Sequence, residues 1–320
     1  MSISCDFESI YVNNINSSDT SLGNTLFIIS AQYALSKKYN LKMNINRLIV
    51  YLDIIKKYGY DHDKTIFSKF IERFDSSLLE NYTLINENKH HSEIFDSNII
   101  KEIEEVLKNN INSNVNSNVN SNIQIFGYLQ SHLYFNEYRN DLLELYSIDN
   151  NSMNYITNNY KLLFDDNYIC IAIHVRANYG RINYNFNYFN KAIQFIIEKI
   201  EKDEINKNKK IIFYVFSNNL EYVNRLFANK NINFIFVRNP VDYIDLWIMS
   251  LCKHNIISHS TFAWWGAYLN NNSDKIIIYP KDALRIYWGC LYNSYMLTER
   301  ITEHYMEDWI CLEIDTLIIT

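Results

Sequence analysis

The stretch Tyr168–Val175 reads YICIAIHV, an unbroken apolar run of the length of one strand. Similar runs follow it, and segments long enough for helices separate them. The runs are IIFYVF (211–216), INFIFV (232–237), HNIIS (254–258) and KIIIY (275–279), and the helical segments are Asn187–Lys202, Asn219–Phe227, Asp242–Leu251 and Thr261–Asn270. Strands that alternate with helices predict a parallel sheet. Runs that are apolar throughout indicate helices on both faces. The second half of the chain is therefore predicted to be an α/β domain.

Polar residues stand where three of these predicted strands end. His174 and Arg176 close the first run, Ser217 and Asn218 close the second, and Ser258–Thr261 close the fourth. In open α/β sheets ligands bind at this edge, because the crevice and the helix N-termini meet there. The sequence therefore predicts a nucleotide or phosphate site at the carboxyl edge of the sheet.

The first half of the chain carries weaker signals. Leu22–Tyr39 has apolar residues at helical spacing after a Gly-Asn turn and ends in lysines, which suit the C-terminal dipole. NIQIFGYL (122–129) predicts a short strand, and an aromatic-rich helix is expected around His132–Tyr146. The polar repeat Asn109–Asn122 has no apolar periodicity, so it predicts a flexible surface loop.

Composition narrows the class of protein. The chain has 320 residues, of which 48% are hydrophobic and 21% charged, with a net charge of −6. It can bury a large core, as one large domain or two ordinary ones. An excess of acids over bases argues against binding to nucleic acid or to an anionic membrane. No apolar run approaches the roughly 20 residues of a membrane span, and no leader is evident, so a cytoplasmic protein is expected. Scarce glycine and abundant asparagine favour an AT-rich genome, microbial or viral.

Three patterns raise the question of a metal site. Cys252 and His254 lack a second pair of ligands, and the five cysteines show no zinc spacing. Asp61-His62-Asp63 spells DxD, a metal–diphosphate motif, but it precedes a helix-like segment where capping is the favoured role. His90-His91 has no partner ligand and is interpreted as surface. We predict no metal site.

The stretch DLWIMSLCKHNIISHSTFAWWGAYLN (245–270) combines a helix, a buried strand and a Ser/Thr-rich turn that opens another helix. Ser260 or Thr261 is the expected N-cap, and the N–H groups behind it would form an anion cradle. From the pattern alone, an ordinary capped helix with Trp264 and Trp265 in the core is an equally good interpretation.

This stretch resembles the signature of the α1,2-fucosyltransferase family, LM..C.H.I..NSSFSWWGA.L. The residues in register are Met249, Cys252, His254, Ile256, Ser260, Phe262, Trp264, Trp265, Gly266, Ala267 and Leu269. Three other segments are similar to family motifs in the same order: LGNTLF (22–27) to GGLGNQ.F, FGYLQSHLYF (126–135) to GY.QS..YF, and FSNNLEYV (216–223) to FS.D..WV. The chain is therefore identified as a member of this family.

One motif departs from the family pattern. The family reads H.RRGDY where this chain reads HVRANYG (174–180). Arg176 matches the first arginine, whereas Ala177 replaces the second, and Asn178 and Tyr179 replace Gly and Asp. The missing guanidinium removes a charge-assisted contact of about 1.5–3 kcal/mol. Arg181 is an alternative second cation, and His259 in place of the usual Asn is a further departure.

The resemblance implies a GT-B-like α/β fold, with two Rossmann-like domains and the active-site cleft between them. Residues 1–160 would form the acceptor-side domain with a disordered loop near 109–122, 161–283 the GDP-sugar domain, and 284–320 a segment that packs back across both. The implied reaction is inverting, metal-independent transfer of L-fucose from GDP-fucose to a glycan hydroxyl, usually the 2-OH of galactose. No cofactor is implied beyond the donor substrate, and the oligomeric state is not predicted.

The resemblance and the residue pattern together give a set of candidate site residues. Arg176 and His174 are the candidates for catalysis, with Arg176 and the N–H groups of the capped helix stabilising charge on the β-phosphate. Candidates for donor binding are Gly23, Asn24, Arg176, Ser217, Asn218, Ser260, Thr261 and Phe262. No residue is assigned as general base, since the motif aspartate has no counterpart. Two alternatives stay open: a different GDP-deoxyhexose donor, or an inactive glycan-binding relative.

Overall fold

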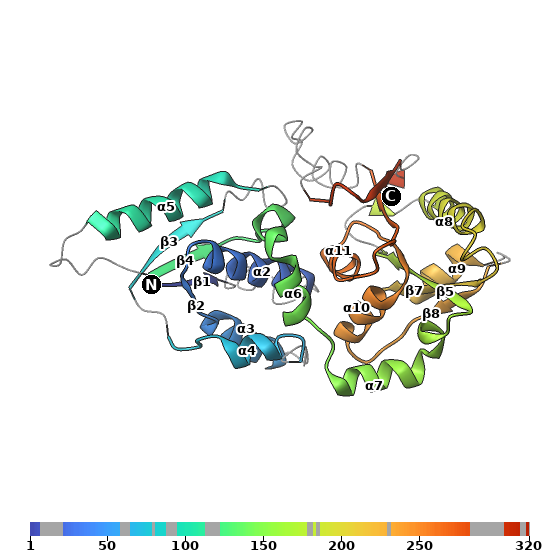
Figure 1. Ribbon diagram of the computed structural model, residues 1–320, viewed down its shortest axis with the longest axis horizontal. Coiled ribbons are helices and arrows are strands. Elements are labelled where there is room, and N and C mark those ends of the chain that lie inside the picture. The colour runs from blue at the N-terminus through green and yellow to red at the C-terminus, as the bar shows by residue number, and fades with distance from the viewer. Residues whose placement is uncertain are drawn as a thin grey trace. The chain divides into compact units, whose positions relative to one another are not determined.

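The computed structural model (Figure 1) describes residues 1–6, 22–57, 65–78, 81–87, 95–112, 122–177, 182–183, 186–228, 232–281, 304–313 and 318–319. The chain divides into two compact units. The first unit is Met1–Ser147 with Thr302–Met306, and the second is Ile148–Ile301 with Glu307–Thr320. Each unit contains a parallel sheet with helices, which confirms the α/β fold class.

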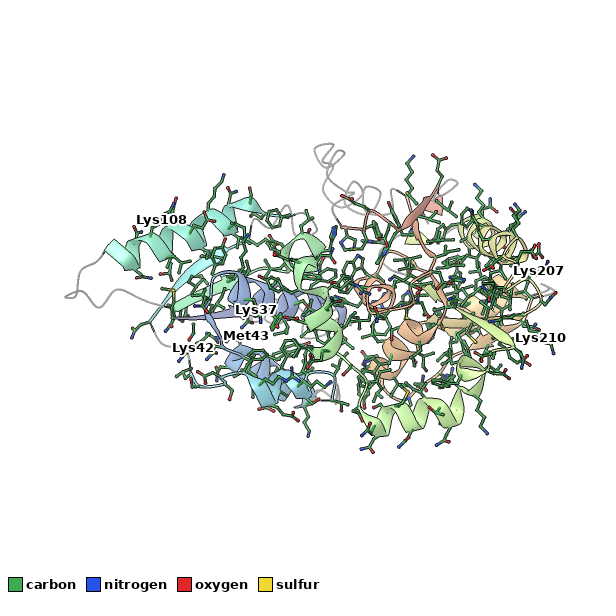
Figure 2. The ribbon with its side chains drawn as sticks, viewed as in Figure 1. Lys37, Lys42, Met43, Lys108, Lys207 and Lys210 are labelled. Atoms are coloured by element: carbon green, nitrogen blue, oxygen red, sulfur yellow. The ribbon has the colours of Figure 1, made fainter. Side chains whose placement is uncertain are left out.

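The first unit is built on a four-stranded sheet in the order β2-β1-β4-β3. All neighbouring strands are parallel. The strands are β1 (Ser2–Asp6), β2 (Lys42–Met43), β3 (Tyr82–Asn86) and β4 (Asn122–Phe126), and the helices are α2 (Leu22–Lys38), α3 (Asn46–Lys57), α4 (Ser68–Arg73), α5 (Ser97–Asn112) and α6 (Arg139–Leu145). Lys42, labelled in Figure 2, pairs with Ser2 at the amino edge of this sheet.

Two expectations for the first half are corrected. Helix α5 continues to Asn112, so the polar repeat begins inside a helix, and residues 113–121 lie outside the described part. The expected aromatic helix around His132–Tyr146 is present only in its second part, as α6, and its first part is two short 3₁₀ turns, His132–Tyr134 and Asn136–Tyr138. The side chain of Ser131 accepts the Leu133 N–H and so caps the start of the first turn. The predicted helix at Leu22–Tyr39 is confirmed as α2, but it is buried almost all round rather than on one face.

The second unit contains a six-stranded parallel sheet in the order β11-β10-β9-β5-β7-β8. Its strands are β5 (Tyr168–Val175), β7 (Lys210–Ser217), β8 (Phe234–Phe236), β9 (His254–Ile256), β10 (Ile277–Pro280) and β11 (Ile310–Leu312), and its helices are α7 (Asn150–Asn159), α8 (Phe186–Glu201), α9 (Leu220–Phe227), α10 (Asp242–Leu251) and α11 (Thr261–Tyr268). A separate antiparallel pair joins β6 (Ile182–Asn183) to β12 (Ile318–Ile319). The five predicted strands of this half are confirmed.

Helix α7 falls in the second unit, although the sequence placed residues up to 160 in the first domain. The reason is a set of hydrogen bonds at the loop before α10. Asn239 Oδ1 accepts from the hydroxyls of Tyr155 (3.0 Å) and Tyr160 (2.8 Å), and its amide donates to Asp245 at 2.6 Å. These bonds tie α7 and the residues after it to the second sheet's helices.

The core of the second unit lies around the central strand β5. Ile171 and Ile173 are fully buried and pack with residues of α8 and α9. Trp264 and Trp265 are also fully buried, as the core interpretation of that pair predicts. Gly266 of α11 faces Met249 of α10, and a Cβ at Gly266 would lie 2.6 Å from the Met249 Cε. The absent side chain therefore allows α11 to pack closely on α10.

Candidate functional site

The polar residues predicted at one sheet edge do meet there. In the strand register His174 lies opposite Phe216, Val175 lies opposite Ser217, and Ile173 of β5 pairs with Ile256 of β9. Lys210, labelled in Figure 2, opens β7 at the amino edge, which is the opposite end of the strand from Ser217. Because the strands are parallel, the residues that follow β5, β7 and β9 share the carboxyl edge.

The hydroxyl of Ser258 joins two of the predicted site residues. It lies 2.8 Å from Nδ1 of His174 and accepts the backbone N–H of Arg176 at 3.1 Å. Ser258 is fully buried just beyond β9. The Ser258 side chain, just after β9, therefore holds the carboxyl end of the neighbouring strand β5.

His174 is a neutral side chain in this environment. Only 5% of the residue is exposed, and its ring centroid lies 5.8 Å from that of Phe262 at the start of α11. Burial, and to a lesser degree the nearby positive charge of Arg176, lower the pKa of His174 to about 3. The ring therefore offers hydrogen bonds at this edge but no positive charge near neutral pH.

Asn218 has a role that the sequence did not reveal. Its Oδ1 accepts the backbone N–H of Ala177 at 2.8 Å, and its Nδ2 donates to the Ala177 carbonyl at 2.9 Å. This two-point contact fixes the backbone directly after Arg176. Ala177, at the position of the family's second arginine, is itself 2% exposed. The buried position suits a small side chain.

Ser217 supports the helix that follows its strand. Its hydroxyl accepts the N–H of Asn219 at 3.1 Å, and the Asn219 side chain in turn accepts the N–H of Tyr222 at 2.9 Å as the N-cap of α9. Asn219 is thus a second supporting residue that sequence reasoning missed. The signal that could have found it is an asparagine directly before a helical segment.

The N-terminus of α11 reaches the same edge. Ser260 is the N-cap residue, as predicted, with φ −164° and ψ 129°, although its side chain makes no capping hydrogen bond. The first bond inside the helix runs from the Trp264 N–H to the Ser260 carbonyl at 2.9 Å. The N–H groups of Thr261, Phe262 and Ala263 precede that bond, and all helices present such groups at the positive end of the dipole.

Gly23 and Asn24 lie in the first unit, inside the first turn of α2 rather than in a turn before it. Gly23 is buried, and Asn24 is partly exposed. The Oδ1 of Asn24 accepts a hydrogen bond from Nε2 of Gln130 at 2.9 Å. Gln130, four residues after the end of β4, is therefore hydrogen-bonded to the start of α2, and neither sequence motif alone indicates this link.

His304 packs in the first unit beside Gln130 and Phe27. Its Nδ1 lies 3.0 Å from the carbonyl of Gln130, and its ring stacks on Phe27 with centroids 5.9 Å apart. A carbonyl only accepts, so Nδ1 carries the proton. Burial lowers the pKa of His304 to about 4. The expected C-terminal segment thus contributes a buried, neutral side chain to the first unit, and its own sequence gave no sign of this.

A buried carboxyl group supports the turn after β4. Glu87 Oε2 accepts the backbone N–H groups of Tyr128 (2.7 Å) and Leu129 (3.1 Å). Burial raises the pKa of Glu87 to about 8, against the opposing effect of these two bonds. Leu129 has φ 51°, and a Cβ at Gly127 would lie 2.4 Å from the Glu87 Cβ. The turn therefore requires glycine at 127 and holds a strained backbone at 129.

The candidate metal ligands find other roles or lie outside the described residues. His254 accepts the N–H of Ile276 at 3.0 Å through Nδ1, and burial raises the pKa of Cys252. In the described ranges, no cluster of three or more His, Cys, Asp or Glu side chains could hold a metal ion. The Asp61–Asp63 motif, the His90-His91 pair, and Asn178, Tyr179 and Arg181 are outside the described residues.

Comparison with known sequences decides the family. The profile of "Glycosyl transferase family 11" matches residues 16–312. The chain belongs to this family. That result confirms the resemblance carried by the sequence motifs, and it places Arg176, His174 and the α11 N-terminus inside a family 11 domain.

Two relatives of this family 11 chain come from Escherichia coli. The O-antigen biosynthesis glycosyltransferase WbnK is 28% identical over 201 residues, which are 59% of this chain and 60% of WbnK. An alpha-1,2-colitosyltransferase is 31% identical over 97 residues, which are 29% of this chain and 30% of the relative. The matches thus span less than two thirds of the length of either relative.

Solved structures also resemble the family 11 chain. A mutant of Arabidopsis thaliana FUT1 in complex with GDP aligns with a TM-score of 0.48 and 12% identity, over 86% of this chain and 70% of that one. NodZ α-1,6-fucosyltransferase co-crystallized with GDP aligns with a TM-score of 0.44 and 9% identity, over 83% and 90%. Across the described residues, none of the helices combines the length and the apolar character of a membrane span.

Proposed function

We propose that this chain transfers L-fucose from GDP-fucose to a hydroxyl of a glycan, with inversion at C1 and without a metal ion. The galactose 2-OH is the proposed acceptor group. The observation that carries the proposal is the meeting of Arg176, His174 and the α11 N-terminus at one carboxyl edge in a family 11 chain. These are the groups that a leaving diphosphate requires.

In the proposed reaction the acceptor oxygen attacks C1 of the sugar, and the bond from C1 to the β-phosphate oxygen breaks. GDP leaves with the electron pair of that bond, and the acceptor proton passes to a base or to solvent. Arg176 and the first-turn N–H groups at Ser260–Phe262 stabilise the charge that grows on the β-phosphate. His174 contributes a hydrogen bond rather than a charge, because it is neutral.

Gly23 and Asn24 are proposed to face the donor from the first unit. The carbonyl oxygen of the Asn24 side chain accepts a hydrogen bond from Gln130, which orients the amide. The absence of a side chain at Gly23 is proposed to allow close approach of a ligand to the backbone.

A second candidate function is transfer of a different GDP-deoxyhexose. The small, buried Ala177 in place of the family's second arginine changes the environment beside Arg176, and one relative is named an alpha-1,2-colitosyltransferase. An inactive glycan-binding protein is the third candidate, because the same replacement removes one cation. A panel of GDP-sugars separates the first two, and the absence of any donor binding would favour the third.

The test is isothermal titration of GDP and then GDP-fucose, without metal and again with EDTA. The wild type is expected to bind both with micromolar, EDTA-insensitive affinity, and Arg176→Ala is expected to lose roughly 10–150-fold in affinity, the value of one charge-assisted contact. Arg225→Ala is the matched control, because that arginine lies exposed on α9 with Glu221 3.9 Å away. If neither ligand binds the wild type, the transferase proposal fails.

A further inference from the structure

Ser258 is the residue of the second unit's carboxyl edge whose role neither the motifs nor the family signature specify. The signature leaves its position open, between the buried strand and the Ser/Thr-rich turn. Its hydroxyl nevertheless makes both of the contacts that hold the end of β5, one to the His174 ring and one to the Arg176 backbone. Those are the residues on which the proposed function depends.

The directions of these two hydrogen bonds follow from what each group can do. The Arg176 N–H can only donate, so the Ser258 oxygen accepts that bond. The hydroxyl keeps one proton of its own. Within the described part of the chain, its one available acceptor is Nδ1 of His174 at 2.8 Å, and Ser258 is fully buried from water. A buried hydroxyl proton without an acceptor is costly, so the hydroxyl donates to Nδ1.

This direction determines the state of the ring. Nδ1 can accept a hydrogen bond from Ser258 only if it carries no proton, so the proton of the neutral imidazole is on Nε2. The opposite arrangement, with Nδ1–H donating to Ser258, would leave the buried hydroxyl proton unsatisfied. The chain of bonds from the Arg176 N–H through the Ser258 hydroxyl to Nδ1 also polarises each member in the same sense.

We propose that Ser258 is a positioning residue of the donor site, which holds His174 as the Nε2–H tautomer and fixes the backbone that carries Arg176. His174 then presents a neutral N–H donor at the edge where the diphosphate of the proposed function would lie. The ring packs against Phe262, so its position is also fixed relative to the first turn of α11. The assignment rests on the proposed function for its ligand, but the tautomer is a property of the free protein.

The ring state can be measured without any ligand. In protein labelled with ¹⁵N in the histidine rings, long-range proton–nitrogen spectra distinguish the two tautomers, and a His174→Gln variant assigns the His174 signals. The wild type is expected to show a protonated Nε2 and an unprotonated Nδ1, unchanged between pH 5 and 8. Ser258→Ala removes the proton donor to Nδ1 and is expected to shift His174 toward the Nδ1–H form. A wild-type ring protonated at Nδ1 would overturn the proposal.

Ligand affinity gives the second readout. Titration with GDP is expected to be about ten-fold weaker for Ser258→Ala, because both the ring and the Arg176 backbone lose their anchor. Ser258→Thr keeps the hydroxyl and is expected to restore the wild-type tautomer and most of the affinity. Ser250→Ala is the matched control. The Ser250 hydroxyl donates a hydrogen bond to the Trp247 carbonyl at 2.8 Å, but it lies near the C-terminus of α10.

The two readouts separate failure of this inference from failure of the proposed function. If Ser258→Ala keeps both the wild-type tautomer and the wild-type GDP affinity, Ser258 is not a positioning residue. If the wild type shows the Nε2–H tautomer but binds no GDP, the donor site is wrong while the control of His174 by Ser258 stands. Thermal unfolding of each variant checks that the fold is kept, and Ser258→Thr tests the hydroxyl even if the alanine variant is unstable.

Discussion

The carboxyl edges of the two sheets are held in different ways. In the second unit, short polar side chains at strand ends hold one another: Ser258 holds His174 and Arg176, and Asn218 holds Ala177. In the first unit, a buried acid and a side chain from the C-terminal segment hold the turn after β4. The first kind of edge leaves a local signature in sequence, whereas the second depends on residues far apart in the chain.

The largest expected difference in stability between the two units comes from replacing one glycine in each with alanine. Gly127→Ala would place a Cβ 2.4 Å from the Glu87 Cβ, whereas Gly266→Ala would place one 2.6 Å from the Met249 Cε, the flexible end of that side chain, and 2.9 Å from the Met249 Cβ. The first substitution is expected to cost about 3 kcal/mol or more in the free energy of unfolding and the second about 1–3 kcal/mol. Denaturant titration of both variants measures the two losses in free energy of unfolding. Equal or reversed losses would contradict the tighter packing at Gly127.

A smaller difference is expected in the dependence of stability on pH. The folded pKa of Glu87 is about 8, above its ordinary value of 4.5, so the folded state binds the extra proton and stability falls as pH rises between these values. The folded pKa of His174 is about 3, below its ordinary 6.5, so its contribution rises with pH and is complete above pH 6.5. Of these two groups, only Glu87 therefore changes the free energy of unfolding appreciably between pH 6.5 and 8.

Glu87→Gln tests this sign. Ionisation of Glu87 is expected to remove about 1–2 kcal/mol of stability between pH 6.5 and 8, and the glutamine variant is expected not to lose this contribution, since it cannot ionise. Hydrogen exchange of the β4 amides reports on the first unit directly. Asp245, whose pKa burial raises to about 7, contributes in the second unit and serves as the internal comparison through Asp245→Asn. A Glu87→Gln variant with the wild-type pH profile would show that Glu87 is ionised throughout.

Much of the second edge was predictable from sequence. Continuous apolar runs gave the strands, and the polar residues after Val175, Phe216 and Ile257 gave the edge itself. What sequence could not show is how these side chains are used. Asn218 was expected to bind donor, yet both groups of its amide contact the backbone of Ala177, and such a contact depends on the register of β5 against β7.

Less of the first edge was predictable, for a physical reason. Glu87 follows a strand with mixed polarity, and a single acid after such a strand is usually solvated. Its burial arises from the packing of the Gly127–Leu129 turn, which no local pattern encodes. His304 reaches the first unit across a sequence separation of 174 residues from Gln130. Long-range partners of this kind become visible only when the chain is folded.

The smallest effect is expected from the Asn218 contact. Asn218→Ala removes two hydrogen bonds at a partly exposed site and is expected to cost about 1 kcal/mol in stability, with a similar loss in GDP affinity. Asn219→Ala, which removes the α9 cap but not the Ala177 contact, is the matched control: it should lower stability without lowering GDP affinity. Loss of affinity in the control variant would contradict the separate roles.

We propose that the carboxyl edge of the second sheet binds the donor diphosphate. Hydrogen–deuterium exchange of the wild-type protein with and without GDP tests it most directly, because the amides concerned are known. We predict that GDP slows exchange at the end of β5, around Arg176, and in the first turn of α11, around Thr261–Trp264. Protection confined to the first unit, or no protection at either segment under saturating GDP, would contradict the claim.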